Sequence, residues 1–292
     1  MNFKIRKSII SPVNCIYILD CSLAGDMNSI QRLEDDLKSL LAQKANLDSE
    51  FNEYIKSIQI LNVKDHNEFM IAKRQILSDG KKKIINPLLL IYGHGDKKKG
   101  LKLPSGGFIN WDLLSSCLDE IVSLSLGELT VIGAFCHSYQ IVEKYENRLT
   151  RKLPFSYYYG YSKDISFGKV EEDILNIVRS VILYGGEDFK IKKTCFSSYS
   201  EFDYIALIIS LSTMLAKEPE QIHKLNNRLS GVVSIRSLKE EFLSTSTFPA
   251  GEAKRIFNEV VRSFSLTESI ILKYMHDTER RQFLLEDLKS HF

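Results

Sequence analysis

The sequence lacks a hydrophobic run long enough to cross a membrane. The longest apolar stretch, Ala206 to Leu211, falls far short of the roughly 20 residues that a spanning helix needs and is expected to be a core helix. The apolar stretch Ile16 to Leu19 is short, ends at Asp20 and does not have the pattern of a signal peptide. We therefore expect a protein without a membrane span, located in the cytoplasm.

The sequence also lacks an excess of charge of one sign. Its 39 basic and 37 acidic residues give a formal net charge of +2, which does not favour a nucleic acid or an anionic membrane as the main partner. The triplets Lys81–Lys83 and Lys97–Lys99 are local exceptions. Neither is interleaved with the aromatic residues that stack on single strands, so both are expected to be solvated loops.

Paired cysteines and nucleotide-binding signatures are missing as well. The five cysteines are odd in number and show no CxxC spacing, which disfavours a disulfide framework and a zinc finger. Neither a Walker A pattern nor a GxGxxG fingerprint is present, which makes a nucleotide site less probable without excluding it. We expect no metal and no cofactor. The cysteines are Cys15, Cys21, Cys117, Cys136 and Cys195.

What the sequence does contain is an alternation of strand-like and helix-like segments over its first two thirds. Strands are predicted at residues 14–19, 54–63, 87–92, 129–135 and 155–161, with segments of helical spacing between them. This alternation predicts an α/β domain, residues 1–195, with a mostly parallel sheet flanked by helices. Residues 196–292 show helical spacing and no convincing strand, so we predict a helical C-terminal module, joined near residues 190–200.

Two of the predicted strands end in reactive side chains. The strand at 87–92 runs into Gly93-His94-Gly95, and the strand at 129–135 runs into Cys136. Because the carboxyl ends of parallel strands form the ligand crevice of an open α/β sheet, His94 and Cys136 are expected to meet there. A thiol beside an imidazole can act as a nucleophile. We predict Cys136 as nucleophile, His94 as base, and the backbone N–H groups of Gly95 and Cys136 as oxyanion donors.

Simpler structural roles compete with these predictions. Cys136 could be a small buried side chain, which is the commoner fate of a cytoplasmic cysteine, and His94 could cap a turn. The pairing of the two at neighbouring strand ends makes us prefer the nucleophile and the base. His137 follows Cys136 directly and is expected to point away or to orient neighbouring groups. Residues 25–28 are expected to form a turn with side-chain caps for the first helix.

Three charged residues are candidates for substrate binding. Asp164 and Lys163 follow the strand at 155–161; Asp164 in the cleft would favour a basic substrate side chain, and Lys163 an acidic one. Both are as easily solvated loop charges. Asp20 either lines the crevice or caps the turn before the first helix.

The two strand-end motifs resemble those of the caspase-like cysteine peptidases, a clan that includes caspases, metacaspases, separase and the bacterial CHAT domains. Tyr92–Gly95 resembles the His-Gly motif of that clan, and Phe135–Ser138 resembles the Cys-His-Ser-Gly of metacaspases. Residues 100–114 are similar to the hairpin and helix entry of CHAT domains. Tyr139 and Ala134 depart from the metacaspase pattern, so its specificity pocket does not carry over to this chain.

The resemblance covers residues 13–183 and implies peptide-bond hydrolysis by a His-Cys dyad. It suggests a regulated, CHAT-type endopeptidase that cuts a partner protein, in antiviral defence or programmed cell death. The helical module would then bind an activating or regulatory protein. Two alternatives keep the fold but not this activity: an inactive caspase-like interaction module, and a sensor of nucleotides or second messengers.

Overall fold

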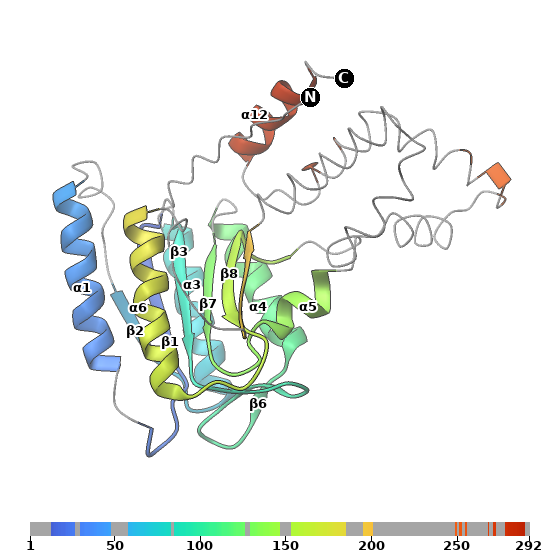
Figure 1. Ribbon diagram of the computed structural model, residues 1–292. Coiled ribbons are helices and arrows are strands. Elements are labelled where there is room, and N and C mark those ends of the chain that lie inside the picture. Colours follow the sequence, from blue (N-terminus) through green and yellow to red (C-terminus); the bar gives the residue numbers. More distant parts are fainter. Residues whose placement is uncertain are drawn as a thin grey trace. The chain divides into compact units, whose positions relative to one another are not determined.

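The computed structural model describes residues 13–26, 30–47, 58–82, 85–125, 129–146, 153–184 and 195–200, and in the C-terminal region residues 249, 251–252, 255, 268, 271–272 and 278–289. The chain divides into two compact units, one of residues 1–142 and 154–199 and the other of residues 143–153 and 200–292. The first unit contains every predicted site residue and the main sheet apart from its last residue, Ser200. Figure 1 shows the strands of this sheet with helices beside them.

Six strands form a mixed, mostly parallel sheet in the order β2-β1-β3-β7-β8-β9. The pairs β1–β2, β1–β3, β3–β7 and β7–β8 are parallel. The predicted α/β class and mostly parallel sheet are thereby confirmed. The strands are β1 (Cys15–Asp20), β2 (Ile58–Asn62), β3 (Pro87–Tyr92), β7 (Thr130–Ala134), β8 (Tyr157–Tyr161) and β9 (Phe196–Ser200).

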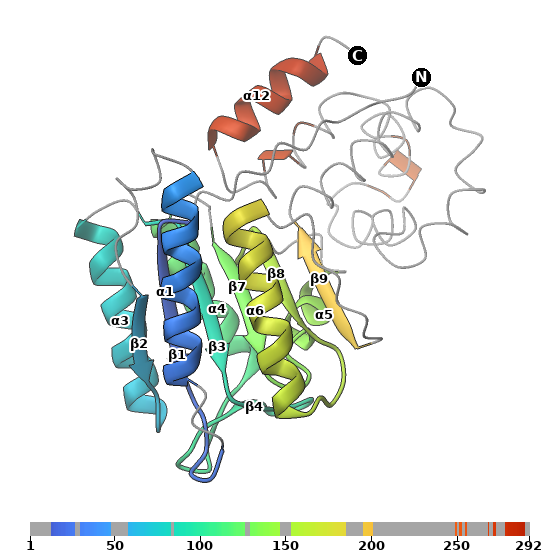
Figure 2. The same ribbon diagram turned by 60° about the vertical axis from the view of Figure 1, so that its left-hand side comes forward.

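The central strands are buried along their whole length because helices cover both faces of the sheet. Every residue of β3 and β7 is buried. On one face, alternate strand residues such as Leu88 and Leu90 pack against α1 (Ile30–Leu47) and α6 (Phe167–Tyr184), which lie side by side (Figure 2). α3 (His66–Lys82) and α4 (Trp111–Leu124) contact each other on the opposite face (Figure 2).

Local sequence signals set the start and the packing of α4. The side-chain oxygen of Asn110 accepts a hydrogen bond from the N–H of Leu113 at 2.9 Å, which makes Asn110 the N-cap. The ring of Trp111 stacks on Phe135 with 6.1 Å between ring centroids, and its Nε1 donates to the carbonyl of Lys97 at 3.0 Å. α4 is thereby attached both to the end of β7 and to the hairpin that follows β3.

That hairpin is a second, three-stranded antiparallel sheet made of β4 (His94–Asp96), β5 (Gly100–Lys102) and β6 (Phe108–Ile109). The sequence analysis expects a loop or hairpin here. In the structure His94 opens the new sheet and pairs with Lys102, so the imidazole is carried on hydrogen-bonded backbone and not on an open loop.

The structure adds one strand to the sequence analysis, which expects none beyond residue 195. β9 follows β8 as the last strand of the sheet, and the ring of its Phe196 lies 6.0 Å from that of Tyr161. Most of the predicted helical module, residues 196–292, lies outside the described residues; its longest described helix is α12 (Thr278–Lys289). The domain boundary at residue 195 stays a prediction. No described helix is long and apolar enough to cross a membrane.

Candidate functional site

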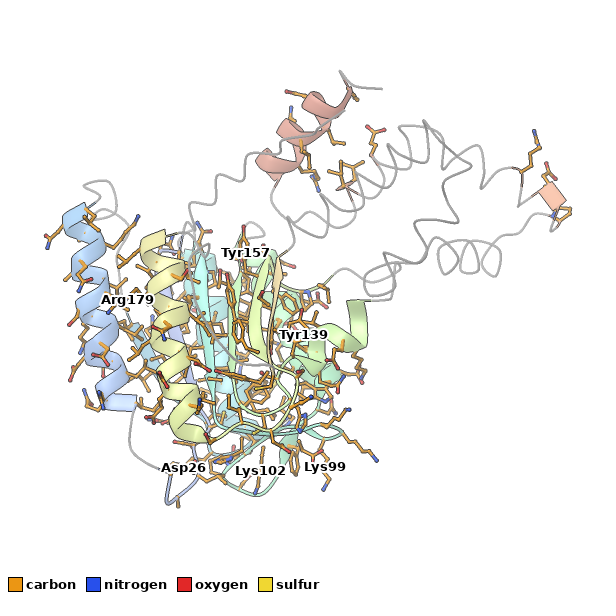
Figure 3. All side chains as sticks on the ribbon, in the orientation of Figure 1. Asp26, Lys99, Lys102, Tyr139, Tyr157 and Arg179 are labelled. Carbon is orange, nitrogen blue, oxygen red and sulfur yellow. The ribbon has the colours of Figure 1, made fainter. Side chains whose placement is uncertain are left out.

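The predicted site lies where the chain reverses its direction across the sheet. From β1 the chain proceeds outward to β2, and from β3 it proceeds the other way to β7 and β8. Such a switch point, at the carboxyl ends of the strands, is where open α/β sheets bind ligands. Asp26 lies in the turn after β1, and His94 follows β3. Figure 3 shows Asp26 at this end of the sheet, with Tyr157, the first residue of β8, at the other.

Asp26 orients the His94 ring. The Nε2 atom of His94 lies 3.0 and 2.9 Å from the two carboxylate oxygens of Asp26. Asp26 is itself fixed, because its Oδ2 also accepts a hydrogen bond from the N–H of Leu23 at 2.6 Å. A carboxylate at Nε2 favours the tautomer that carries its proton there, which leaves Nδ1 as the acceptor nitrogen. From the sequence, Asp26 is expected only in a capping turn, so its contact with His94 is not predicted.

Two glycines let the His94 segment approach its neighbours closely. A Cβ placed on Gly95 would overlap the carbonyl oxygen of Cys136 and lie 2.6 Å from Cδ2 of Phe135. A Cβ on Gly93 would lie 3.0 Å from Cβ of Cys21. The loop after β3 therefore packs directly on the loop after β7, and the two predicted motifs come together at Gly95 and Cys136.

The Cys136 thiol is hydrogen-bonded to one backbone residue. Its Sγ lies 3.4 Å from the carbonyl oxygen of Ile165, to which the S–H donates, and 3.3 Å from the backbone nitrogen of Ile165, from which it accepts. Thiols are weak donors and weak acceptors, so each bond alone is modest. Together they occupy both hydrogen-bonding roles of the thiol.

His137 turns the chain after Cys136 and contacts the segment that follows β8. Its φ of 58° is left-handed, a conformation that histidine adopts more readily than most residues. Its N–H donates to the carbonyl of Lys163 at 3.3 Å, its Nδ1 lies 3.3 Å from the carbonyl oxygen of Ser162, and its Nε2 lies 3.0 Å from Oδ1 of Asp164. This agrees with the expectation that His137 orients neighbouring groups.

Ser138 is a structural residue. It is fully buried, its Oγ donates to the carbonyl of Gly133 at 2.7 Å, and the same Oγ accepts from the N–H of Tyr161 at 2.9 Å. The hydroxyl of Tyr158 donates to the carbonyl of Ser138 at 2.8 Å. Burial raises the pKa of Tyr158 far above its usual value, so this hydroxyl stays protonated. The serine therefore joins the turn after β7 to β8.

The second lysine triplet closes the turn between β4 and β5. The backbone N–H groups of Lys99 and Lys98 each donate to Oδ1 of Asp96 at 2.8 Å. These bonds, together with the charge of Lys99, lower the pKa of the Asp96 carboxyl. The packing of Gly95 on the carbonyl of Cys136 shows that the hairpin and the Cys136 loop are close in space.

The three candidates for substrate binding have different surroundings. Oδ1 of Asp20 accepts from the N–H and the hydroxyl of Ser22 at 3.0 and 2.6 Å, as in the capping alternative. The Asp164 side chain is 90% exposed and contacts His137, the residue that follows Cys136 in the sequence. Lys163 is exposed, and its carbonyl accepts from the N–H of His137. A substrate-binding role for each stays a prediction.

The five cysteines differ in accessibility. Cys15, Cys21 and Cys117 are buried, whereas Cys136 and Cys195 are partly exposed. Burial raises the pKa of Cys117 to about 11, and that of Cys21 beyond its usual range. A thiol reagent in neutral solution will therefore meet two accessible sulfurs, which makes Cys195 a natural control for Cys136.

A pocket of about 520 Å³ lies between α1 and α6, and Cys136 is not among the residues that line it. It reaches Tyr92, whose hydroxyl donates to Glu171 at 3.0 Å. Charges of both signs line it, from Arg32 and Arg179 to Asp36, Glu171 and Glu172, so it selects no class of ligand. Among the described residues, no three His, Cys, Asp or Glu side chains gather into a possible metal site.

Comparison with known proteins adds no family assignment. No protein-family model matches the chain, and no curated protein matches it. The functional argument therefore depends on the residues and their geometry.

Proposed function

We propose that this protein is a caspase-like cysteine endopeptidase in which Cys136 is the nucleophile and His94 the base. The observation that supports this most is the packing of Gly95 on the carbonyl of Cys136, which joins the loops after β3 and β7. The contact with Asp26 adds an oriented imidazole whose acceptor nitrogen is Nδ1.

In the proposed reaction, the thiol proton of Cys136 passes to Nδ1 of His94, and Sγ bonds to the carbonyl carbon of a substrate peptide. The carbonyl oxygen becomes an oxyanion, for which the backbone N–H groups of Gly95 and Cys136 are the proposed donors. The C–N bond breaks, the leaving amine takes the proton from His94, and water hydrolyses the thioester. Asp26 stabilises the imidazolium that forms in the first step.

The substrate in this proposal is a partner protein, with Asp164 or Lys163 selecting the side chain next to the cleaved bond. The C-terminal region would bind an activating or regulatory protein. The cytoplasm fits the activity, because a reducing compartment keeps the thiol available. A role in antiviral defence or programmed cell death is carried only by the resemblance to CHAT domains and metacaspases.

Covalent labelling with peptidyl electrophiles tests the proposal. The full chain is treated with warheads that carry arginine, lysine, aspartate or leucine next to the electrophile, and labelling rates are followed by intact mass and peptide mapping. We expect one adduct, on Cys136, lost in Cys136→Ala and kept in Cys195→Ala. Labelling of Cys195 at the same rate as Cys136 would contradict an activated nucleophile and favour the inactive interaction module.

A further inference from the structure

The segment Ser162–Ile165, here called the strap, lies against the thiol on which the proposed function depends. It connects β8 to α6, and its last residue provides both backbone groups that contact Sγ of Cys136. The sequence analysis considers this segment only for substrate binding, because backbone contacts leave no signal in the sequence.

Hydrogen bonds hold the strap at several points. His137 makes three contacts with it, to Ser162, Lys163 and Asp164, at 3.3, 3.3 and 3.0 Å. At its start, the N–H and the hydroxyl of Ser162 both donate to the carbonyl of Cys195, at 2.8 and 3.2 Å. The strap is therefore attached to the turn that carries the nucleophile and to the residue before β9.

We propose that the strap keeps Cys136 in a resting state and must move off the thiol before the reaction can begin; this inference rests on the proposed function. A thiol has a single proton, and a proton donated to the carbonyl of Ile165 is not donated to His94. A substrate carbonyl carbon must also come within about 3–3.5 Å of Sγ, a distance at which Ile165 backbone atoms already lie on one side of the sulfur.

His137 and Asp164 are the positioning residues for this strap. The Asp164 side chain is 90% exposed, so its removal disturbs no core packing, yet it takes away one of the three contacts with His137. Asp35→Ala is the control, since Asp35 is an exposed carboxylate on α1, a helix that carries no residue of the proposed site. His137→Asn is a second variant, because asparagine also tolerates a left-handed backbone.

The test measures how fast iodoacetamide, which is too small to need a substrate pocket, alkylates Cys136 in the full chain. We expect alkylation in Asp164→Ala to be about two- to fivefold faster than in the wild type, as for loss of an exposed ion pair. His137→Asn, which loses two side-chain contacts with the strap, should be faster still, and Asp35→Ala should match the wild type. If both Asp164→Ala and His137→Asn are alkylated no faster than Asp35→Ala, the inference is overturned.

Failure of the strap and failure of the proposed function give different results. If the strap inference is correct but the proposed function is not, iodoacetamide alkylates Asp164→Ala faster than the wild type. A peptidyl electrophile then labels Asp164→Ala and the double variant Asp164→Ala/His94→Ala at the same rate. If the proposed function is correct but the strap inference is not, labelling by the peptidyl electrophile slows in His94→Ala, and the rate of iodoacetamide alkylation in Asp164→Ala equals that of the wild type.

Discussion

Two histidine–carboxylate pairs lie in the segments that follow the strands, and they are built in opposite ways. In the pair His94–Asp26 the carboxylate is the fixed partner: its side chain is 16% exposed and a backbone N–H holds it, whereas the histidine is 36% exposed. In the pair His137–Asp164 the histidine is the fixed partner, 17% exposed, and the carboxylate is 90% exposed. The contact distances are nearly equal, 2.9 and 3.0 Å.

Which member of each pair is held in place by other contacts indicates the role of that pair. In the first pair the carboxylate holds Nε2 of His94, an arrangement that suits the proposed general base. In the second pair both ring nitrogens of His137 lie against oxygens of the strap, so this histidine attaches a neighbouring segment. Distance alone does not distinguish the two pairs, whereas exposure and backbone contacts do.

The largest effect should come from removing the base. We expect His94→Ala to slow acylation of Cys136 by a peptidyl electrophile about 10²- to 10⁴-fold, the usual contribution of a positioned acid or base. The other histidine provides the contrast, because His137→Asn should label no more slowly than the wild type. The second-order rate constant of labelling is measured for both variants. If it falls equally in His94→Ala and His137→Asn, the two pairs do not have different roles.

A smaller loss should follow from removing the charge on the fixed carboxylate. Asp26→Asn keeps the size of the side chain but loses a charge-assisted contact with Nε2 of His94, which is worth about 1.5–3 kcal/mol. Labelling of Cys136 should slow about 10- to 100-fold. Asp35→Asn, on the exposed side of α1, is the control. If Cys136 is labelled as fast in Asp26→Asn as in Asp35→Asn, Asp26 does not orient His94.

The contact between the two loops can be broken at Gly95. In Gly95→Ala the new Cβ would overlap the carbonyl of Cys136, so we expect a loss of roughly 1–3 kcal/mol in the free energy of unfolding. Gly168→Ala is the control, because nothing lies within 4 Å of a Cβ there. Urea unfolding measures both. If Gly95→Ala is as stable as Gly168→Ala, the loops do not pack as described.

The smallest effect should appear at the exposed carboxylate. Asp164→Ala removes only a surface contact, so we expect the free energy of unfolding to fall by no more than about 0.2–1 kcal/mol. Asp26→Ala should cost more, because it leaves the N–H of Leu23 without its acceptor. Urea unfolding of the two variants, run side by side, compares them. If Asp164→Ala lowers the free energy of unfolding more than Asp26→Ala does, Asp26 is not the more firmly held carboxylate.

The sequence predicts the mostly parallel sheet, because apolar runs are local signals; the pairing of the His94 and Cys136 side chains stays a prediction. Gly93-His94-Gly95 and Cys136 lie directly after β3 and β7. Asp26 is missed because its partner lies 68 residues away. One signal could have found it: a carboxylate soon after the first strand is placed near His94 once β1 and β3 are known to be neighbours.

Other parts of the site leave no trace in the sequence. The contact between Ile165 and Cys136 is made by backbone atoms, which every residue type provides. β9 is short and rich in serine, so its residues resemble a linker, and its pairing with β8 comes from the sheet edge and from the contact of Phe196 with Tyr161. The left-handed φ of His137 is equally invisible, because no glycine marks it.

The bonds from Ser162 to Cys195 have a mechanical consequence. The residue that begins the strap donates two hydrogen bonds to the carbonyl just before β9, and the chain continues from β9 into residues 200–292. A pulling force applied to the chain beyond residue 200 would load this edge strand and, through it, the bonds of Ser162. Tension along the polypeptide could in this way reach the strap without any ligand entering the crevice.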